Sequence, residues 1–308
     1  MRPILALTAA LALVAGCATA PDSAPDVGPS RLIHDLRILA ADDMQGRAPD
    51  TEGGLKARAY LVQRLEDLGV AAPPSGRLQA ISGEVRRQSG TRQVSGANIL
   101  GLIPGTTYPD RYIVVTAHYD HLGVHDDQIH NGADDNASGV SSVLELARRL
   151  KARPPEHSVL IVFFDAEESG LLGARRFVEN PIVPLTSIAL NLNLDMTARA
   201  ETDNHLWVTG TYQNPTFRPL LEPIAPVDGV SLSFGKDTPQ DTGANNWVEA
   251  SDHGPFYRAG VPFIYLGVDF HPDYHQPTDD FDRVRPEVFT AATELAVRAF
   301  RALDQGVE

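Results

Sequence analysis

Carboxylate and imidazole side chains recur along this chain in a few short, distinctive stretches. AHYDHLG contains His118, NGADDNASGV contains two adjacent aspartates, and FFDAEESGLLGA contains the adjacent pair Glu167 and Glu168. Further along, LNLDMT contains Asp195 and DYHQPTDD contains His275. Imidazole nitrogen and carboxylate oxygen are the groups with which proteins bind zinc and related divalent ions. The chemistry that these stretches suggest is therefore that of a metal site.

Taken alone, each stretch also has an ordinary explanation. His118 and Asp120 can be a surface pair, although a carboxylate at this spacing can also accept the second N–H of a ligating imidazole. NGADDNASGV can be a helix N-cap, and the paired glutamates can be an acidic first turn. Adjacent glutamates in a loop can equally point to different sides, so that one binds metal while the other takes a proton. His271 competes with His275, because HPDYH contains both.

Apolar periodicity indicates the elements that position these side chains. Helices are expected over residues 30–41, 55–68, 138–150, 170–178 and 286–303, and strands over 112–117, 159–164, 188–194, 206–209 and 263–266. Residues 73–98 are polar and irregular, with at most short edge strands. Buried strands alternating with helices predict an α/β fold of three layers, with a mostly parallel central sheet and helices on both faces. Ligands bind such sheets at the carboxyl ends of the strands, where three of the stretches fall.

The first residues are typical of a targeting segment. Arg2 precedes an apolar run that is too short to span a bilayer, and residues 14–16 precede Cys17. Residues 1–16 resemble a bacterial lipoprotein signal peptide, after which Cys17 is lipidated; an ordinary cleaved signal is the alternative. Because Ala18 is not an aspartate, the resemblance implies an outer-membrane anchor and a location in the periplasm or cell envelope. Residues 17–29 are expected to form a flexible tether to one domain, residues 30–308.

Composition excludes several classes of function. The net charge of -14 argues against nucleic acid and anionic membrane surfaces as partners, so membrane contact is expected only through Cys17. A single cysteine excludes an intramolecular disulfide and a CxxC zinc site. The 43% of hydrophobic residues is sufficient for a sizeable core. The sequence does not indicate an oligomeric state.

In order, H-x-D, D-D-N-x-S-G, D-x-E-E-S-G, L-D-M and Y-H-x-P resemble the motifs of the co-catalytic two-zinc metalloaminopeptidases of the bacterial leucyl aminopeptidase type. Their superfamily includes glutamate carboxypeptidase, glutaminyl cyclase and the transferrin receptor ectodomain. The resemblance covers about residues 97–280. It implies a zinc-exopeptidase-like fold, a metallopeptidase catalytic domain over residues 30–308, and two Zn²⁺ per chain.

The resemblance also implies the ligands of the two metals. Asp135 would bridge both ions. His118 and Asp195 would complete the site of one ion, and Glu168 and His275 the site of the other.

Further roles are implied for residues around the ligands. Glu167 would be the general base, and Asp120 would orient the first histidine ligand. Tyr274 would stabilise the oxyanion of the reaction, and the peptide bond between residues 135 and 136 would be cis. Asp252, in SDHGPF, would lie beside the site without binding metal.

The implied function is that of an aminopeptidase. It would hydrolyse the N-terminal bond of a peptide with water held by the two metals, and Glu167 would take the proton of that water. Two enzymatic alternatives are a glutaminyl-cyclase-like acyltransferase and a metallocarboxypeptidase or deacylase. The latter usually carries D-x-K-G where this chain has DDNASG. The alternative outside enzymes is a periplasmic binding lipoprotein with a degenerate site. The substrate pocket is expected to be shaped by the loops between positions 197 and 247. These loops contain aromatic residues that either line the pocket or belong to the core, namely Trp207, Tyr212, Phe217, Phe234 and Trp247.

Overall fold

The structure is a computed structural model that describes residues 30–87 and 90–307. The expected signal peptide (1–16) and tether (17–29) lie outside the described residues, so both stay predictions. Among the helices that are described, none combines the length and the apolar character needed to cross a bilayer.

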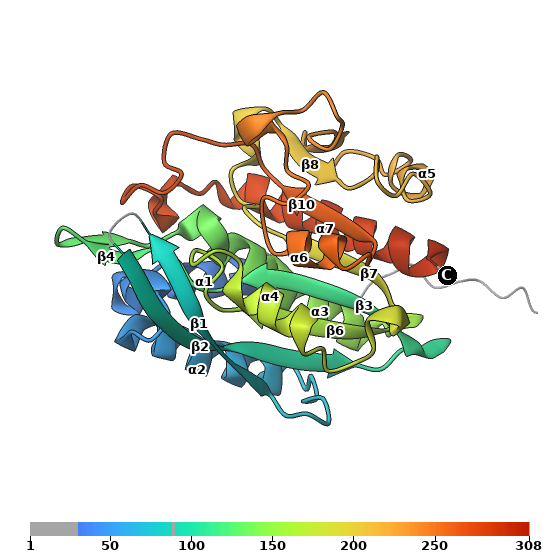
Figure 1. Cartoon of the computed structure of the whole chain (residues 1–308). Helices are drawn as coiled ribbons and strands as arrows, with labels where there is room; N and C mark the ends of the chain where they lie inside the picture. Colours follow the sequence, from blue (N-terminus) through green and yellow to red (C-terminus); the bar gives the residue numbers. More distant parts are fainter. Residues whose placement is uncertain (1–29, 88–89, 308) are drawn as a thin grey trace, which may run out of the picture.

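An eight-stranded mixed sheet forms the centre of the molecule, in the order β1-β2-β6-β3-β7-β10-β8-β9 (Figure 1). The strands are β1 (Leu78–Arg87), β2 (Gly90–Ile103), β3 (Tyr108–His118), β6 (His157–Phe164), β7 (Ile188–Leu194), β8 (His205–Thr209), β9 (Ser231–Phe234) and β10 (Phe263–Gly267). The four middle strands, β6, β3, β7 and β10, run parallel. Their carboxyl ends therefore meet at one edge. A separate hairpin, β4 (Gly123–His125) with β5 (Gln128–His130), follows β3.

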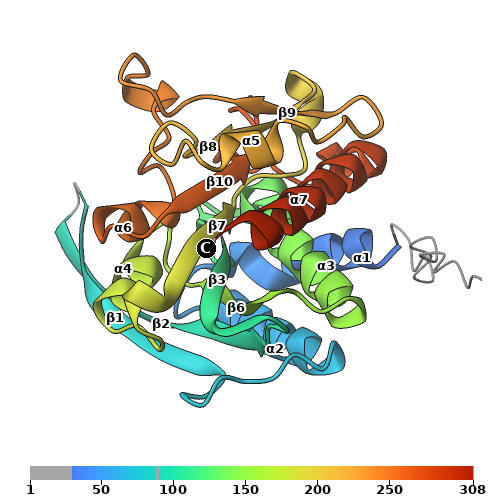
Figure 2. The same ribbon diagram turned by 90° about the vertical axis from the view of Figure 1, so that its right-hand side faces the viewer.

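Helices cover both faces of this sheet, as predicted (Figure 2). They are α1 (Ser30–Leu39), α2 (Glu52–Asp67), α3 (Gly139–Ala152), α4 (Leu172–Glu179), α5 (Arg218–Leu221), α6 (His253–Arg258) and α7 (Pro286–Gly306). One core contains buried side chains of α1, α2, α3 and α7, and a second core contains those of α4 and α6. Residues of β6 alternate between the two: Ile161 enters the first core, and Val162 enters the second. This double burial explains the continuous apolar runs of the middle strands.

Residues 73–98 differ from the expectation of short edge strands. β1 and β2 form a long antiparallel hairpin whose register runs from Leu78 opposite Ile99 to Arg87 opposite Gly90. Only a few apolar side chains, such as Ile81 and Val94, are buried there, in a small core of their own. The hairpin is held mainly by main-chain pairing, for which no apolar period is required.

Candidate metal centre

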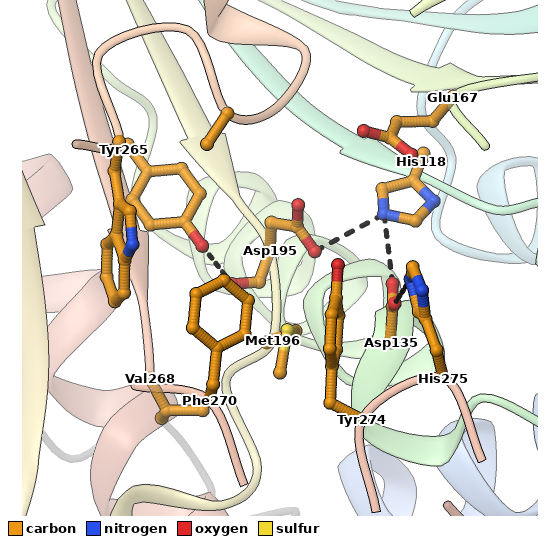
Figure 3. A pocket seen from close by; sticks show the side chains of 12 residues that line it. His118, Asp135, Glu167, Asp195, Met196, Tyr265, Val268, Phe270, Tyr274 and His275 are labelled. Atoms are coloured by element: carbon orange, nitrogen blue, oxygen red, sulfur yellow. Dashed lines mark hydrogen bonds and ion pairs between the residues drawn. The ribbon is translucent and has the colours of Figure 1, made fainter. Parts of the chain in front are cut away.

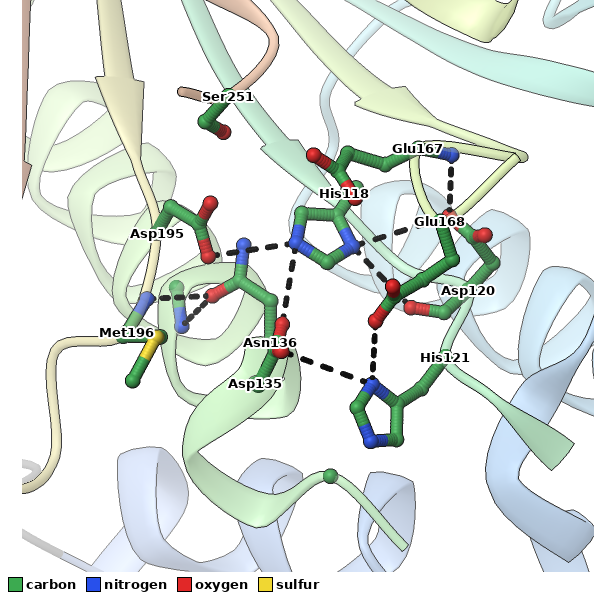
Figure 4. A network of polar contacts seen from close by, with 12 residues as sticks. His118, Asp120, His121, Asp135, Asn136, Glu167, Glu168, Asp195, Met196 and Ser251 are labelled. Atoms are coloured by element: carbon green, nitrogen blue, oxygen red, sulfur yellow. Dashed lines mark hydrogen bonds and ion pairs between the residues drawn. The ribbon is translucent and has the colours of Figure 1, made fainter. Parts of the chain in front are cut away.

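The metal-binding residue types gather at the carboxyl ends of the parallel strands (Figures 3 and 4). His118 is the last residue of β3, and Glu167 and Glu168 lie in the loop after β6. Asp195 directly follows β7, and the loop after β10 carries His275. Parallel strands at the centre of one sheet therefore bring together residues that lie far apart in the sequence.

His118, Asp135 and Asp195 form the first of two groups. The Nε2 atom of His118 lies 3.3 Å from Asp135 Oδ1 and 3.3 Å from Asp195 Oδ1. Its Nδ1 atom donates to the main-chain oxygen of Asp120 at 3.1 Å, so Nε2 is the nitrogen that faces the two carboxylates. The three side chains are largely buried.

The second group shares Asp135 with the first. Asp135 Oδ2 lies 3.1 Å from His275 Nε2, and Glu168 Oε2 lies 3.6 Å from the same nitrogen. His121 adds a second imidazole, whose Nδ1 lies 2.8 Å from Glu168 Oε1 and 3.8 Å from Asp135 Oδ2. The two oxygens of Asp135 thus face different groups.

The turn that presents Asp135 is held from several sides. The Asp135–Asn136 peptide bond is cis, as expected. The carboxylate of Asp279 accepts the main-chain N–H of Asp135 at 3.0 Å and that of Asp134 at 3.0 Å. The Asn136 side chain donates to the Leu194 oxygen at 3.0 Å and so ties the turn to the end of β7. The position of Asp135 is therefore determined by the fold.

The side chain of Arg47 also holds the turns that carry the site residues. The guanidinium of Arg47 is fully buried and donates to four main-chain oxygens, those of residues 39, 119, 131 and 132. Two of these oxygens lie just before the Asp134–Asp135 turn, and one lies between His118 and Asp120. Burial lowers the pKa of Arg47 to about 10, which leaves it charged at neutral pH.

Negative charge is in excess at the site. Burial lowers the pKa of the His118 imidazole, but the carboxylates of Asp195 and Glu167 outweigh it and hold that pKa well above its ordinary value. Burial also opposes ionisation of Asp135, yet the imidazoles of His121 and His118 hold its pKa well below the usual range. Positive charge is what stabilises this arrangement, whether it comes from protons on the imidazoles or from a cation.

The donor set fits divalent metal ions. His118, Asp135 and Asp195 bring ligand atoms within 4.8 Å of one another, and so do His121, Asp135 and Glu168. Glu168 Oε1 and both ring nitrogens of His121 are buried without a hydrogen-bond partner among the described residues. Buried polar atoms are rarely unpaired in native proteins, so these atoms are suited to binding a group that is not part of the chain. A mixed set of imidazoles and carboxylates suits Zn²⁺.

Glu167 lies beside the two groups without joining either. It lines a pocket together with His118 and Asp195 (Figure 3). Burial raises the pKa of Glu167 well above its ordinary value, the His118 imidazole opposes that shift, and Glu168 and Asp252 add to it. A carboxyl group with a raised pKa at the edge of a pocket is suited to exchanging protons with a bound molecule.

Asp120, Tyr274 and His271 take distinct places around the groups. Asp120 Oδ1 lies 3.7 Å from His118 Nδ1 and accepts the main-chain N–H of Glu167 at 2.9 Å, so this carboxylate joins the loops after β3 and β6. Tyr274 lines the pocket, and its ring stacks on that of His275 with centroids 3.8 Å apart. His271 pairs with Asp134 at 3.0 Å.

The rest of the pocket wall is aromatic and apolar. Of the five aromatic residues expected there, only Trp247 lines the pocket, and it is joined by Met196, Tyr265, Val268 and Phe270. Trp247 packs edge-on against Tyr265 and Phe270, with ring centroids at 5.6 and 6.0 Å.

His121, Asp279 and Arg47 are the parts of the site that sequence reasoning did not single out. His121 could have been found from its spacing, because a residue three positions after His118 just beyond a strand can turn back to the same site. Asp279 and Arg47 act on main-chain groups, and no local pattern marks such contacts.

Comparison with known proteins identifies relatives. Residues 98–300 match the sequence pattern of Peptidase family M28. Aminopeptidase YwaD of Bacillus subtilis is 32% identical over 224 residues, which are 68% of this chain and 45% of that protein. The probable lipoprotein aminopeptidase LpqL of Mycobacterium tuberculosis is 33% identical over 198 residues, or 53% of this chain and 38% of that protein. The chain thus spans half or less of the length of these curated relatives.

Solved structures share the fold. A zinc aminopeptidase from Bacillus subtilis, BSAP, superposes with a TM-score of 0.71 at 18% identity, covering 91% of this chain and 95% of that one. Glutaminyl cyclase from Porphyromonas gingivalis gives a TM-score of 0.70 at 20% identity, covering 89% and 97%. Proteins described as a peptidase and as a cyclase match equally well, so the fold does not distinguish the two activities.

Proposed function

This chain belongs to peptidase family M28, and we propose on that premise that it is a zinc-dependent aminopeptidase. The observation that carries the proposal is the position of Asp135, whose two carboxylate oxygens face two different groups of imidazole and carboxylate ligands. One zinc ion would be held by His118, Asp135 and Asp195, and a second by Asp135, Glu168 and His275. Bound zinc would acidify water and polarise the scissile carbonyl group.

Glu167 is the general base in this proposal. Its carboxylate borders the pocket beside His118 and Asp195, so it can take a proton from the attacking water and return it to the leaving amine. The hydrogen bond from its main-chain N–H to Asp120 fixes the loop that carries it. Tyr274, whose hydroxyl points toward the carboxylates in Figure 3, would donate a hydrogen bond to the developing oxyanion.

The pocket supports a substrate with a free amine and an apolar first side chain. Carboxylates at one end of the pocket, including Asp195 and Glu167, can bind a protonated α-amine. The wall built from Trp247, Phe270 and Met196 offers apolar surface to the adjacent side chain. We therefore expect peptides that begin with leucine, methionine or phenylalanine to be cleaved fastest.

The test pairs Glu167→Gln with Glu168→Gln. Glu167→Gln should lower kcat on leucyl-anilide on the order of 10²- to 10⁴-fold, because a general base is lost, while the zinc content stays that of the wild type. Glu168→Gln, the matched change at the neighbouring residue, should lower the zinc content itself. Turnover near the wild-type rate in Glu167→Gln contradicts the base assignment.

Substrates and products distinguish the alternatives. N-blocked peptides should be resistant, and their cleavage favours a carboxypeptidase or deacylase. Product masses should show addition of water to peptides, whereas loss of ammonia from N-terminal glutamine indicates a cyclase.

The lipid anchor on Cys17 is also part of our proposal. With it, the enzyme would face the periplasm from the outer membrane. A full-length Cys17→Ser variant expressed in a Gram-negative host should move from the membrane fraction to the soluble fraction. Unchanged fractionation argues for a different signal.

A further inference from the structure

His121 has no role in the function proposed above, yet it is one of the most enclosed polar side chains of the site. Its side chain is fully buried, and its Nδ1 lies 2.8 Å from Glu168 Oε1 (Figure 4). Despite that short distance, the two ring nitrogens of His121 and the Oε1 atom of Glu168 form no hydrogen bond with any described residue. The ring N–H direction therefore does not point at the carboxylate oxygen.

This geometry differs from that of a hydrogen-bonded pair. A buried imidazole and a buried carboxylate oxygen each lose hydration, at a cost that a hydrogen bond normally offsets. Here the two atoms lie side by side, and Asp135 Oδ2 lies 3.8 Å from the same nitrogen. Atoms that crowd together without bonding one another are typical of ligands that converge on a common third atom.

His275 approaches the same two carboxylates as His121. Its Nε2 lies 3.1 Å from Asp135 and 3.6 Å from Glu168, and the two imidazole rings have centroids 5.9 Å apart with planes tilted by 60°. The exposures differ, since the His275 side chain is 37% exposed and that of His121 is not exposed. A cation between the carboxylates would therefore have one imidazole on the open side and one on the closed side.

We infer that His121 is a fourth protein ligand of the zinc ion held by Asp135, Glu168 and His275. This inference rests on the proposed function. Four protein ligands complete the usual set of a closed zinc site, whereas three leave one position open for water or substrate. The ion beside His118 would then be the one with the open position. Among the second set of ligands, Asp135 and His275 line the pocket, whereas His121 and Glu168 do not. The second ion would therefore face the pocket on the side of His275 and be enclosed on the side of His121.

Two substitutions of His121 that have the same shape as each other distinguish a zinc ligand from a hydrogen-bond donor. Asparagine places an amide N–H where His121 has Nδ1, so His121→Asn can still donate to Glu168 but is a poor zinc ligand. Aspartate has the same shape and offers a carboxylate oxygen, so His121→Asp can bind zinc but cannot donate. The exposed His125, in the adjacent hairpin, gives the control variant His125→Asn.

The experiment measures zinc per chain and zinc affinity after dialysis against zinc buffers. We expect two ions in the wild type, in His125→Asn and in His121→Asp. In His121→Asn, one of the two ions should bind more weakly on the order of 100-fold or more. Thermal unfolding of the chelator-treated proteins should show the His121→Asn protein to be folded; if it is not, His121→Ser replaces it in the comparison.

The outcomes separate this inference from the proposed function. Wild-type zinc affinity in His121→Asn, or tighter binding in His121→Asn than in His121→Asp, overturns the ligand role and leaves the peptidase intact. Fewer than two zinc ions in the wild type instead removes the two-metal function from which the inference starts.

Discussion

His253 gives a prediction of pH dependence whose size follows from its surroundings. The side chain is completely buried at the start of α6, with its ring stacked on Phe263 and its Nε2 donating to the Trp247 oxygen at 2.7 Å. Burial lowers the pKa of His253 from 6.5 to about 4. Between these values the unfolded chain binds a proton that the folded protein does not, so stability is lost as the pH falls below about 6.5.

The expected loss can be worked from the two pKa values. It reaches about 2 kcal/mol at pH 5 and approaches about 3 kcal/mol below pH 4. Glutamine in place of His253 keeps an amide N–H that can reach the Trp247 oxygen but does not titrate. In His253→Gln, the free energy of unfolding should therefore fall by about 2 kcal/mol less between pH 7 and pH 5 than in the wild type.

The assay is urea unfolding of both proteins at pH 7 and pH 5, after chelation so that zinc binding does not add its own pH dependence. Packing changes caused by glutamine affect both pH values alike and cancel in the difference. Equal losses in the two proteins, within about 0.5 kcal/mol, refute the neutral buried histidine.

Three further predictions concern the frame and the wall of the site. Arg47→Met leaves four main-chain oxygens without their hydrogen-bond donor. The free energy of unfolding, measured by denaturant titration, should therefore fall by about 3–5 kcal/mol. A decrease of less than about 1 kcal/mol contradicts this role of Arg47. Trp247→Ala should raise KM for leucyl- and phenylalanyl-anilides about tenfold or more with zinc content unchanged, and an equal effect on alanyl-anilide argues against a side-chain pocket. Tyr274→Phe should lower kcat on the order of 10²-fold with little change in KM, and unchanged kcat removes Tyr274 from the oxyanion site.

The sequence predicted the middle of the sheet well because its strands are buried on both sides. β7 has the same limits as the predicted strand, residues 188–194, and every residue in it is buried. The β1–β2 hairpin was beyond prediction for the opposite reason. β1 is the edge strand of the sheet, and the first four residues of β2 are exposed, so the pairing of the two strands leaves a weak trace in the order of apolar residues.

Local sequence patterns located the imidazoles and carboxylates that form the two groups of the site. They missed the residues that bind the main chain of the turns carrying those side chains. His118, Glu168 and Asp195 lie at strand ends that apolar runs reveal. Asp279 holds the Asp134–Asp135 turn from 145 residues further along the chain, and its carboxylate contacts only main-chain N–H groups there. Such contacts depend on tertiary structure, because any segment with a free carboxylate could supply them.

The aromatic wall contacts both groups. Tyr265 donates a hydrogen bond to the main-chain oxygen of Asp195 at 3.0 Å, and Phe270 reaches the second group through Tyr274. Phe270 packs against Tyr274 with ring centroids 4.9 Å apart, and Tyr274 stacks on His275 at 3.8 Å. A change at Phe270 that reshapes the pocket will therefore also move His275, the most exposed of the imidazoles at the site. A buried ligand on the opposite side, as we infer for His121, would hold the second ion while His275 shifts. The pocket wall could then change its shape with the substrate while the second ion stays bound. This is a physical reason for the imidazole of His121, which a site of only Asp135, Glu168 and His275 leaves unexplained.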